Sequence, residues 1–400
     1  MKAAPPDPSI LPYCRTDFQH KVLTAYIELG TAAKAAKACG TEQGTVTKIK
    51  KKIEKVAAAK GVLPQYDLSS KVGAGFELGN GYSLLTKTEL GEPIWLKATK
   101  EKQQAQKALM DFADGLAEDL GTFKPGPKPK MKKVESDLLS AIFIGDAHYG
   151  MNAYGRETKH SDYDTQLAYD NMCRAIDDLV ARSPNSEIGL LVDVGDYTHS
   201  NSSHNETFSG TPLDVDTRHG RVLDVASMGM NYAIQKMLTK FPKVVVVIVQ
   251  GNHNPDVALA MARITSAYFR NETRVKVLET NGFFHYIEWG DWLMGFNHGD
   301  KIKPEKLVSV MARDMADAWG RCASRMWALG HFHHQDVKEL DGCTVQKFAA
   351  LPPPDSWHAS KGFSSVQAMQ MIVFRKEGGK HSTLIYELPR PVHKPDLRID

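Results

Sequence analysis

The sequence has no long hydrophobic run. Its longest aliphatic stretch, Val244 to Val249, is far shorter than the roughly 20 residues that a membrane-spanning helix needs. Residues 1–6 also lack the apolar core of a secretory signal peptide. These two absences exclude a membrane-spanning protein as the expected class, and they predict a cytoplasmic location without membrane contact.

Cysteine is scarce and shows no paired pattern. The 400 residues include five cysteines, and no two of them form a Cys-x-x-Cys pair. A disulfide framework or a zinc ribbon is therefore not indicated. We expect the cysteines to be small apolar residues of the protein interior.

Net charge is also low, at +3, but it is unevenly distributed along the chain. Residues 1–60 hold eleven Lys or Arg and five Asp or Glu, which gives 11 − 5 = +6, so the remainder carries 3 − 6 = −3. A basic N-terminal segment on a near-neutral body favours a polyanion as the partner of that segment. The length predicts one large domain or two to three smaller ones.

The first sixty residues show an apolar spacing of three and four residues that glycine interrupts. Residues 1–12 are rich in proline, and we expect them to be disordered. From Asp17 to Ala59 the pattern predicts three helices, of which the first two end at Gly30 and Gly40. Helices joined by tight glycine turns are typical of the helix-turn-helix motif, so we assign residues 1–62 to a DNA-binding domain.

The third of these helices carries the polar side chains that this interpretation requires. Gln and Thr can contact base edges, and lysines can bind phosphates. The candidate DNA-binding residues are Gln43, Thr45, Thr47, Lys48, Lys51, Lys52 and Lys55. The alternative is a three-helix module for protein contacts whose lysines are simply solvated.

Two further segments carry no predicted chemistry. Residues 63–120 are expected to form a small β-hairpin, with Gly79-Asn80-Gly81 as a turn signal, and then a helix from about Thr99 to Leu120. Residues 121–135 mix proline, glycine and lysine, which predicts a stiff, extended and basic linker.

The pattern changes again at residues 136–391. Apolar runs typical of buried strands alternate there with helical patterns, which favours an α/β core. The expected strands are 138–144, 188–194, 244–249, 292–296 and 326–329, and the expected helices are 162–182, 221–240 and 303–319. The stretch 337–388 is expected to be all-β, with a hairpin turn at Glu377-Gly378-Gly379.

A short polar motif follows each of the five expected strands. The motifs are Asp146-Ala-His148, Gly195-Asp196, Gly251-Asn252-His253, Asn297-His298-Gly299 and Gly330-His331-Phe-His333. Each motif alone is common in loops. Because the carboxyl ends of strands converge at one edge in α/β sheets, the five motifs together predict a single site.

The donors in these motifs are nitrogen and oxygen atoms. The candidate metal ligands are Asp146, His148, Asp196, Asn252, His298, His331 and His333. The set suits two divalent cations that share Asp196, since each carboxylate oxygen can bind one ion. Imidazole and carboxylate favour manganese, iron or zinc over calcium, and magnesium is a further candidate. A two-metal site of this kind implies hydrolysis of a phosphate ester.

The order of the motifs resembles the pattern DxH, GD, GNH, H and GHxH of the calcineurin-like metallophosphoesterases, over about Ser140 to His333. The resemblance implies a four-layer αββα sandwich, preceded here by a small all-α domain and a small β/α segment. It implies one metal, expected to be manganese, on Asp146, His148, Asp196 and His333. A second metal would take Asp196, Asn252, His298 and His331. His253 would then be the catalytic histidine, near the phosphate oxygens or the leaving group.

One residue favours a branch of that superfamily. His199 lies three positions after Asp196, as in the DNA-repair exonuclease branch, which includes bacterial and phage members. Protein phosphatases of the superfamily tend to carry an arginine near this position, and this sequence does not. We therefore expect a DNA nuclease in which His199 positions the phosphate or the leaving strand. The branch also implies a homodimer and a partner ATPase.

Two features depart from the pattern. Asn254 stands where Asp or Glu usually follows the GNH motif, so His253 needs another partner for its orientation. The interval from Asp196 to Asn252 is long (252 − 196 = 56 positions), and its segment 204–219 is a candidate lid. Arg218 and His219 of this segment are candidate phosphate contacts.

Two other functions fit the same residues. The first is a phosphatase or cyclic-nucleotide phosphodiesterase of the same fold, with the N-terminal helices serving localisation. The second is a DNA-binding regulator whose phosphoesterase site is vestigial. The complete ligand set argues against the second.

Overall fold

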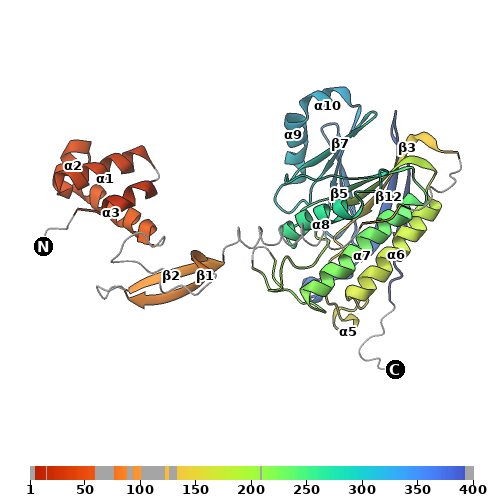
Figure 1. Cartoon of the computed structure of the whole chain (residues 1–400), viewed down its shortest axis with the longest axis horizontal. Helices are drawn as coiled ribbons and strands as arrows, with labels where there is room; N and C mark the ends of the chain where they lie inside the picture. Colours follow the sequence, from red (N-terminus) through yellow and green to blue (C-terminus); the bar gives the residue numbers. More distant parts are fainter. Residues whose placement is uncertain are drawn as a thin grey trace. The chain divides into compact units, whose positions relative to one another are not determined.

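The computed structural model describes residues 5–14, 16–58, 76–87, 93–100, 122–125, 133–207 and 210–391. The chain divides into two compact units, Met1–Ala108 and Leu109–Asp400 (Figure 1). Among the helices of the described residues, none combines the length and apolar character needed to cross a lipid bilayer.

The described residues of the first unit include the helices η1 (Pro8–Tyr13), α1 (Asp17–Leu29), α2 (Ala32–Cys39) and α3 (Gln43–Ala58). Thr16 and Thr31 cap α1 and α2, because each side-chain oxygen accepts a backbone amide of the first turn. Gly30 and Gly40 end the same helices in the left-handed conformation, with φ of 73° and 65°. Three helices therefore form over the range in which the apolar spacing predicts them.

The short helix η1 contradicts the disorder expected for residues 1–12. Ile10 is fully buried and packs with Leu23, Ile53 and Ala57. Burying a large aliphatic side chain contributes roughly 1.5–3 kcal/mol, which offsets part of the entropy lost when the segment is ordered. One isoleucine in a proline-rich stretch thus anchors the segment to the helices.

Two antiparallel strands, β1 (Phe76–Lys87) and β2 (Pro93–Lys100), also belong to the first unit. Gly79-Asn80-Gly81 is not the expected hairpin turn, because it lies inside β1 where the register shifts between Leu78 and Tyr82. Glycine within a strand commonly marks such a bulge. The helix expected from about Thr99 is wrong at its start, which belongs to β2, and its remainder lies outside the described residues. So does most of the expected linker, at 126–132.

The strands of the second unit, over its described residues, form two sheets. The six-stranded sheet has the order β13 (Lys380–Glu387), β12 (Ala368–Arg375), β3 (Glu135–Ile144), β4 (Ser186–Asp193), β5 (Lys243–Ile248) and β6 (Val275–Val277). Strands β3 to β6 run parallel. The five-stranded sheet has the order β10 (Asp336–Leu340), β11 (Cys343–Lys347), β9 (Ser324–Leu329), β8 (Trp292–Phe296) and β7 (His285–Trp289). Strands β8, β9 and β11 are parallel in it.

The two sheets face each other across an apolar core. Leu139, Phe143 and Val192 of the six-stranded sheet share this core with Phe296 of the other sheet and with Phe348, which directly follows β11. The rings of Phe143 and Phe348 stack with their centroids 4.1 Å apart. Aromatic pairs at this distance contribute beyond the area they bury, so this contact helps to fix one sheet on the other.

Helices cover the outer face of each sheet. The six-stranded sheet packs against α6 (Thr165–Arg182), α7 (His219–Leu238) and α8 (Pro255–Tyr268) (Figure 1). The five-stranded sheet packs against α9 (Pro304–Asp314) and α10 (Ala316–Arg321). The order helix, sheet, sheet, helix confirms the predicted four-layer αββα sandwich.

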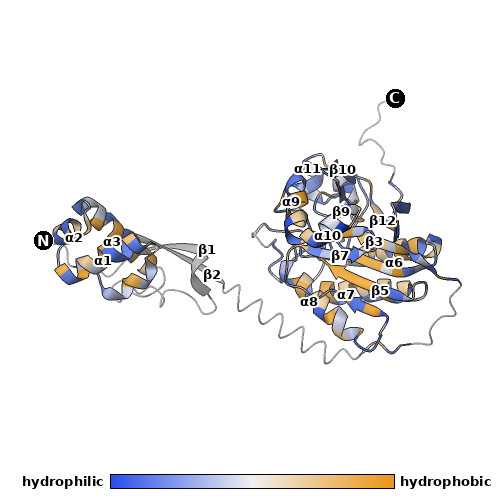
Figure 2. Cartoon of the chain, turned by 90° about the horizontal axis from the view of Figure 1, so that it is seen from above, coloured by the Kyte–Doolittle hydropathy of each residue, from blue (hydrophilic) through white to orange (hydrophobic). Residues whose placement is uncertain are grey.

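Burial on both faces explains the continuous apolar runs of the sequence. In β3, Leu139, Ala141 and Phe143 face the second sheet, whereas Leu138 and Ile142 face the helices. Figure 2 shows the contrast between the helices, which carry both hydrophobic and hydrophilic residues, and the mostly hydrophobic central strands.

Some elements of this unit were not expected. The tail 337–388 is not all-β, because α11 (Ser356–Ser360) interrupts it, capped by the Asp355 carboxylate. The single helix expected at 303–319 is two helices that break at Met315 (φ −122°, ψ 44°). Helix α5 (Gly155–Thr158) and strands β6 and β7 are further additions.

Candidate metal centre

The seven predicted metal ligands follow the ends of five strands. Asp146 and His148 follow β3, Asp196 follows β4, and Asn252 follows β5. The three remaining histidines follow β8 and β9 of the second sheet. Because these strands end at the same edge of the sandwich, the fold brings all seven side chains together, in two neighbouring groups.

The first group contains Asp146, His148 and His333, whose ligand atoms lie within 4.8 Å of one another. The Nε2 atoms of His148 and His333 are 3.1 Å apart, and His333 Nε2 lies 3.8 Å from Asp146 Oδ1. Two ligand atoms that bind one ion at about 2.0–2.2 Å lie roughly 2.9–3.5 Å apart. The paired histidine nitrogens therefore have the spacing of two ligands of a single cation.

The second group contains Asp196, His298 and His331, again within 4.8 Å. His298 Nε2 lies 2.9 Å from Asp196 Oδ2 and 3.1 Å from Asn252 Oδ1. The Nδ1 atom of His298 lies 2.9 Å from the Val194 carbonyl oxygen, to which it can donate. That contact directs Nε2 towards the carboxylate and the amide oxygen.

Asp146 of the first group contacts two residues of the second. His298 Nδ1 lies 3.9 Å from Asp146 Oδ1, and the His331 amide donates to Asp146 Oδ1, while the Asp196 carboxylate belongs to the second group. Both carboxylates are almost completely buried, and within the described part of the chain no lysine or arginine pairs with either. Buried carboxylates without a cationic side chain fit a site that binds metal cations.

Electrostatics supports the same interpretation. Burial and the nearby histidines lower the pKa of His148 well below its usual value, and burial lowers the pKa of His333 to about 3. Both imidazoles are therefore neutral, which is the form that binds a metal. Burial opposes protonation of His298, but the Asp196 carboxylate outweighs it and raises the pKa of His298 to about 10. The site thus stabilises positive charge between these residues.

The ligand loops adopt an uncommon backbone conformation. Five of the predicted ligands have a positive φ, namely Asp146, His148, Asp196, His331 and His333, with values from 38° to 69°. Such residues are uncommon outside glycine and cost of order 1–3 kcal/mol each, and they cluster at functional sites. The surrounding contacts hold them, as in the Asp146 carboxylate, which accepts the His331 amide at 2.8 Å.

Two glycines next to the predicted ligands leave no room for a side chain. A Cβ at Gly251 would overlap the Asp196 carboxylate, and one at Gly195 would lie 2.5 Å from His298 Nδ1. Gly195 also has a φ of 103°, where an L side chain is strained. Both glycines allow the backbone to approach the ligands closely.

His253 and His199 lie at the same centre. Their rings stack with centroids 5.2 Å apart, and both lie within 4.8 Å of His148 by their ligand atoms. His253 Nδ1 lies 2.8 Å from the His199 carbonyl oxygen, and the His253 amide donates to Asp196 Oδ1 at 2.8 Å. The His199 backbone carbonyl therefore orients the His253 ring. It is the other partner that His253 needs because residue 254 is Asn and not Asp or Glu.

His199 itself is buried and neutral. Burial and the neighbouring His253 lower its pKa to about 3, and its Nδ1 lies 3.1 Å from His148 Nδ1. Among the described residues its Nε2 atom has no hydrogen-bond partner. A buried ring nitrogen without a partner is uncommon in folded proteins and is a position from which a ligand can be bound.

Comparison with known proteins gives low similarity. No family model and no curated protein matches the sequence. The chain is similar to the solved structure of wild-type Vps29 with zinc from Entamoeba histolytica (11% identity, TM-score 0.27, covering 62% of this chain and 98% of that one). It is also similar to a conserved Streptococcus pneumoniae protein described as a predicted phosphoesterase (8% identity, TM-score 0.27, covering 64% of this chain and 100% of that one). A third similar structure is that of an archaeal phosphodiesterase, with 11% identity and a TM-score of 0.32, covering 62% of this chain and 99% of that one. At these TM-scores the likeness decides nothing, so fold and site rest on this chain's own residues.

The remaining predicted site residues lie elsewhere. His219 opens α7, and its Nδ1 lies 3.2 Å from the hydroxyl of Ser200, the neighbour of His199. Arg218 is exposed at the preceding position. The candidate lid 204–219 is attached to the body, since Asp216 accepts the amide and the hydroxyl of Thr165 at 2.9 and 2.7 Å, and residues 208–209 lie outside the described part.

The candidate DNA-binding residues all lie on α3 of the first unit. Lys48, Lys51 and Lys52 are exposed, as is Gln43, whose carbonyl oxygen accepts the Thr47 hydroxyl at 3.0 Å. Thr45 and Thr47 are half-buried. The side chain of Lys55 lies outside the described part of the chain.

Sequence reasoning missed two contributors to the site. Asn201 Oδ1 accepts the Asp256 amide at 2.9 Å, which ties the His199 loop to the start of α8. His358 of α11 stacks on His333 with ring centroids 5.0 Å apart, and its Nδ1 lies 2.7 Å from Asp355 Oδ1. The Asp cap before a short helix was the only sequence signal for α11, and no motif spacing links it to the ligands.

Proposed function

We propose that the second unit is a metal-dependent phosphodiesterase of the calcineurin-like metallophosphoesterase superfamily, and that it is a DNA nuclease of the repair-exonuclease type. The observation that carries the proposal is the meeting of two ligand groups at one edge of the sandwich. Each group combines a buried carboxylate with histidine nitrogens, and the groups are in contact through Asp146 and His298. Two adjacent cation sites of this composition are typical of phosphate ester hydrolysis.

The residues fit two divalent cations, for which we propose manganese. The first group would hold one ion and the second group the other, with Asn252 adding a neutral oxygen and Asp196 lying between them. Bound cations of this kind lower the pKa of water and neutralise charge on a phosphate in the transition state. Because the carboxylates are buried, water is kept away from the cations that would neutralise the phosphate charge.

His253 is the proposed proton donor or charge stabiliser. When its Nδ1–H donates to the His199 carbonyl oxygen, Nε2 is the atom left to contact a phosphate or a leaving oxygen. The side chain is half-buried, so part of the ring is accessible. General acid–base catalysis requires a positioned group of this kind within hydrogen-bond reach of the substrate.

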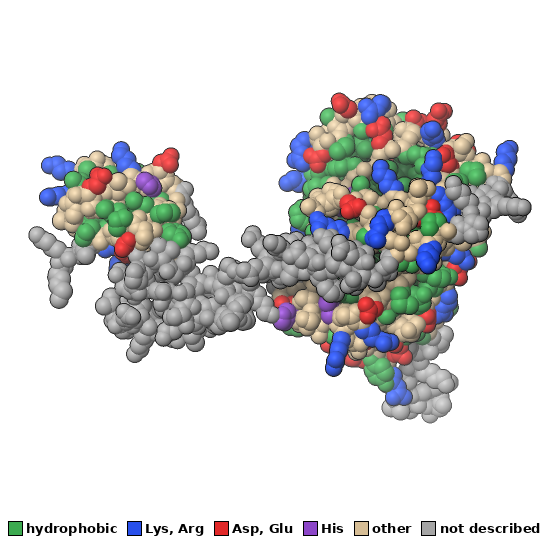
Figure 3. Space-filling model, in the orientation of Figure 1, with side chains coloured by type: hydrophobic (Ala, Val, Ile, Leu, Met, Phe, Trp, Pro, Cys, Tyr) green, Lys and Arg blue, Asp and Glu red, His purple; other side chains and the backbone are tan. Residues whose placement is uncertain are grey.

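A basic helical unit on the same chain favours DNA over a small monoester. Residues 1–60 carry a charge of 11 − 5 = +6, and three lysines are exposed along one side of α3. Figure 3 shows Lys and Arg side chains around the rim of this unit. We propose that α3 contacts DNA and concentrates it near the second unit.

A panel of substrates tests the catalytic proposal. Labelled duplex DNA, single-stranded DNA, an aryl phosphate monoester and an aryl phosphate diester would be offered with manganese. We expect hydrolysis of the diester and of at least one of the two DNAs, and little hydrolysis of the monoester. Faster hydrolysis of the monoester than of either DNA would replace the nuclease by a phosphatase.

Removing the exposed lysines of α3 tests the DNA-binding proposal. Because each phosphate contact releases counterions, the variant with Lys48, Lys51 and Lys52 changed to Ala should bind DNA more weakly. Its plot of log affinity against log salt should be shallower by about 3. The measurement is a salt titration by fluorescence anisotropy.

The matched control removes the same charge elsewhere in the same unit. Lys21, Lys34 and Lys37 are also exposed, on α1 and α2. Changing these three to Ala should leave the salt slope close to that of the wild type. Equal slopes for both triple variants would show that α3 has no particular role in binding DNA.

A further inference from the structure

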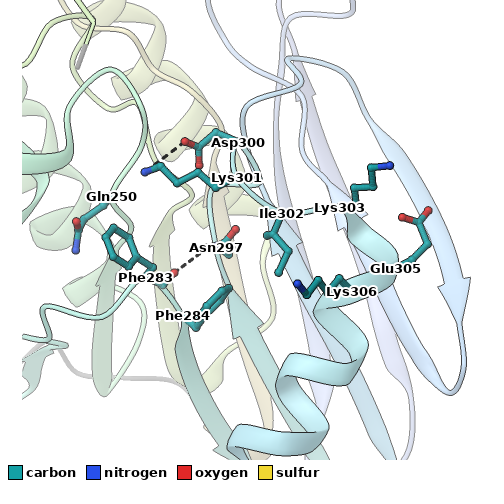
Figure 4. A pocket seen from close by; sticks show the side chains of 10 residues that line it. All are labelled: Gln250, Phe283, Phe284, Asn297, Asp300, Lys301, Ile302, Lys303, Glu305 and Lys306. Atoms are coloured by element: carbon teal, nitrogen blue, oxygen red, sulfur yellow. Dashed lines mark hydrogen bonds and ion pairs between the residues drawn. The ribbon is translucent and has the colours of Figure 1, made fainter. Parts of the chain in front are cut away.

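A pocket of about 490 Å³ lies beside the second ligand group. Gln250 and Asn297 line it, and each is close in sequence to a ligand, since Asn252 and His298 follow within two residues. Figure 4 shows Gln250 and Phe283 on one side of the pocket and the start of α9 on the other. The pocket is therefore next to the metal centre and separate from the ligands themselves.

Phe283 is an exposed aromatic residue in this pocket, and the ligand strands hold it. Its side chain is 54% exposed. Asn297 Nδ2 donates to the Phe283 carbonyl oxygen at 2.8 Å, and Gln250 Nε2 donates to the carbonyl oxygen of Gly282 at 3.4 Å. The two strand ends that position Asn252 and His298 thus also fix the loop that presents this ring.

Positive charge accompanies the aromatic ring. Lys301 Nζ lies 5.1 Å from the centroid of the Phe283 ring, and Lys303 and Lys306 also line the pocket. Asp300 and Glu305 reduce the net charge of the lining to +1. An aromatic face beside lysines is the combination that proteins use to bind a nucleobase together with its phosphate.

A second aromatic site lies beside the first ligand group. Trp357 and Phe363 are 59% and 57% exposed, and their rings lie 6.3 Å apart with an angle of 26° between the planes. Trp357 contacts His358 at a centroid distance of 4.9 Å, and His358 stacks on the ligand His333. This site therefore reaches the metal centre through one intervening ring.

These three residues are a large share of the exposed aromatic surface. In the described part of the second unit, four aromatic residues are exposed, and only Tyr154 lies outside the two sites. Scattered single exposed hydrophobic residues are normal, but aromatic residues gathered at a polar centre indicate binding.

We propose that the Phe283 pocket and the Trp357–Phe363 site stack the unpaired bases on the two sides of the scissile phosphodiester, so that the substrate is single-stranded nucleic acid. The inference rests on the proposed phosphodiesterase function and names its substrate. A base within a duplex is stacked on its neighbours and is not available to a side chain, whereas every unpaired base offers a face to an aromatic ring.

Dinucleotides with one phosphodiester bond test this directly. The substrates are thymidylyl-thymidine, the two analogues in which one thymine is replaced by an abasic sugar, and the analogue with two abasic sugars. Wild-type protein, Phe283→Ala and Trp357→Ala would be compared by kcat/KM with manganese. Met228→Ala is the control, because Met228 is 54% exposed on α7 and belongs to neither site.

We expect each aromatic site to contact one of the two bases, so that each variant loses its sensitivity to the removal of one base only. Removing either base should lower wild-type kcat/KM roughly tenfold. Phe283→Ala should lose about the same factor on the full dinucleotide and become insensitive to the removal of one base, while staying sensitive to the removal of the other. Trp357→Ala should show the reverse. All four proteins should hydrolyse the doubly abasic analogue at similar rates.

Other outcomes overturn the proposal. If both variants hydrolyse the full dinucleotide like the wild type, or if they lose the same factor on the doubly abasic analogue, the aromatic residues do not bind bases. If the wild type hydrolyses the doubly abasic analogue as fast as the full dinucleotide, the phosphodiesterase stands and the base sites do not. If it hydrolyses none of the four, the proposed function fails as well.

Discussion

Replacing Asp196 with Asn is expected to abolish hydrolysis and to remove most of the bound metal. The carboxylate lies 2.9 Å from His298 and accepts the amide of His253, and it is 1% exposed. An amide offers one oxygen and no charge, so it cannot offset two cations. A loss of about 4 kcal/mol in the stabilisation of the transition state corresponds to roughly a 1000-fold fall in kcat/KM.

The measurement combines metal content with activity. We expect purified Asp196→Asn, dialysed against manganese, to hold fewer than half as many ions as the wild type. The melting temperature in chelator should be close to that of the wild type, because the ligand is lost and the fold is kept. A variant with full metal content and full activity would show that Asp196 is not a ligand.

Asp193 provides the matched control for this substitution. It is also a fully buried carboxyl, three positions before Asp196, and its Oδ1 accepts the Gly195 amide at 3.0 Å. Burial raises the pKa of its carboxyl well above the usual value, which favours the neutral acid, a group close in shape and charge to an amide. Asp193→Asn should therefore retain the hydrogen bond, the metal and the activity.

Replacing His253 with Asn is expected to lower turnover while metal binding is unchanged. His253 belongs to the site through its contacts with His199 and Asp196, and it lies outside both groups that we assign to the ions. General acid–base catalysis contributes typically 10²–10⁴-fold, so kcat should fall by about that factor. The fall should be larger for alkyl diesters than for aryl diesters, whose leaving groups need no proton.

The control for His253 is an exposed histidine of the same unit. His381 lies at the start of the edge strand β13, beside the end of β12 that pairs with the beginning of β3, so it lies away from the end of β3 that Asp146 follows. Its substitution by Asn should change neither metal content nor turnover. If His253→Asn kept wild-type turnover on alkyl diesters, the role assigned to this histidine would be wrong. If it lost metal instead, His253 would be a ligand.

The sequence predicts the sandwich and the grouping of ligands because both follow from strong local patterns. In β3 to β5 both faces of each strand are buried, so the apolar runs are continuous and their ends are clear. A polar motif directly after such a run must lie at the carboxyl edge of the sheet. That rule places Asp146, Asp196 and Asn252 without knowledge of the tertiary structure.

Contributors without a local pattern could not be found in this way. His358 lies 358 − 333 = 25 positions after His333, and only the path of the chain through β10, β11 and α11 returns it to the site. Phe283 likewise lies in a loop without a recognisable motif, and only the folded structure shows that Asn297 donates to its carbonyl oxygen. Gly79-Asn80-Gly81 predicts a turn but forms a bulge in β1, because glycine permits both conformations.

Anomalous scattering from crystals grown with manganese tests the central claim most directly. We expect two peaks, roughly 3.5–4 Å apart as in other two-metal sites. One should lie against Asp146, His148 and His333 and the other against Asn252, His298 and His331, with Asp196 between them. Absence of both peaks from saturated crystals, or manganese bound only at residues outside this set, would contradict it.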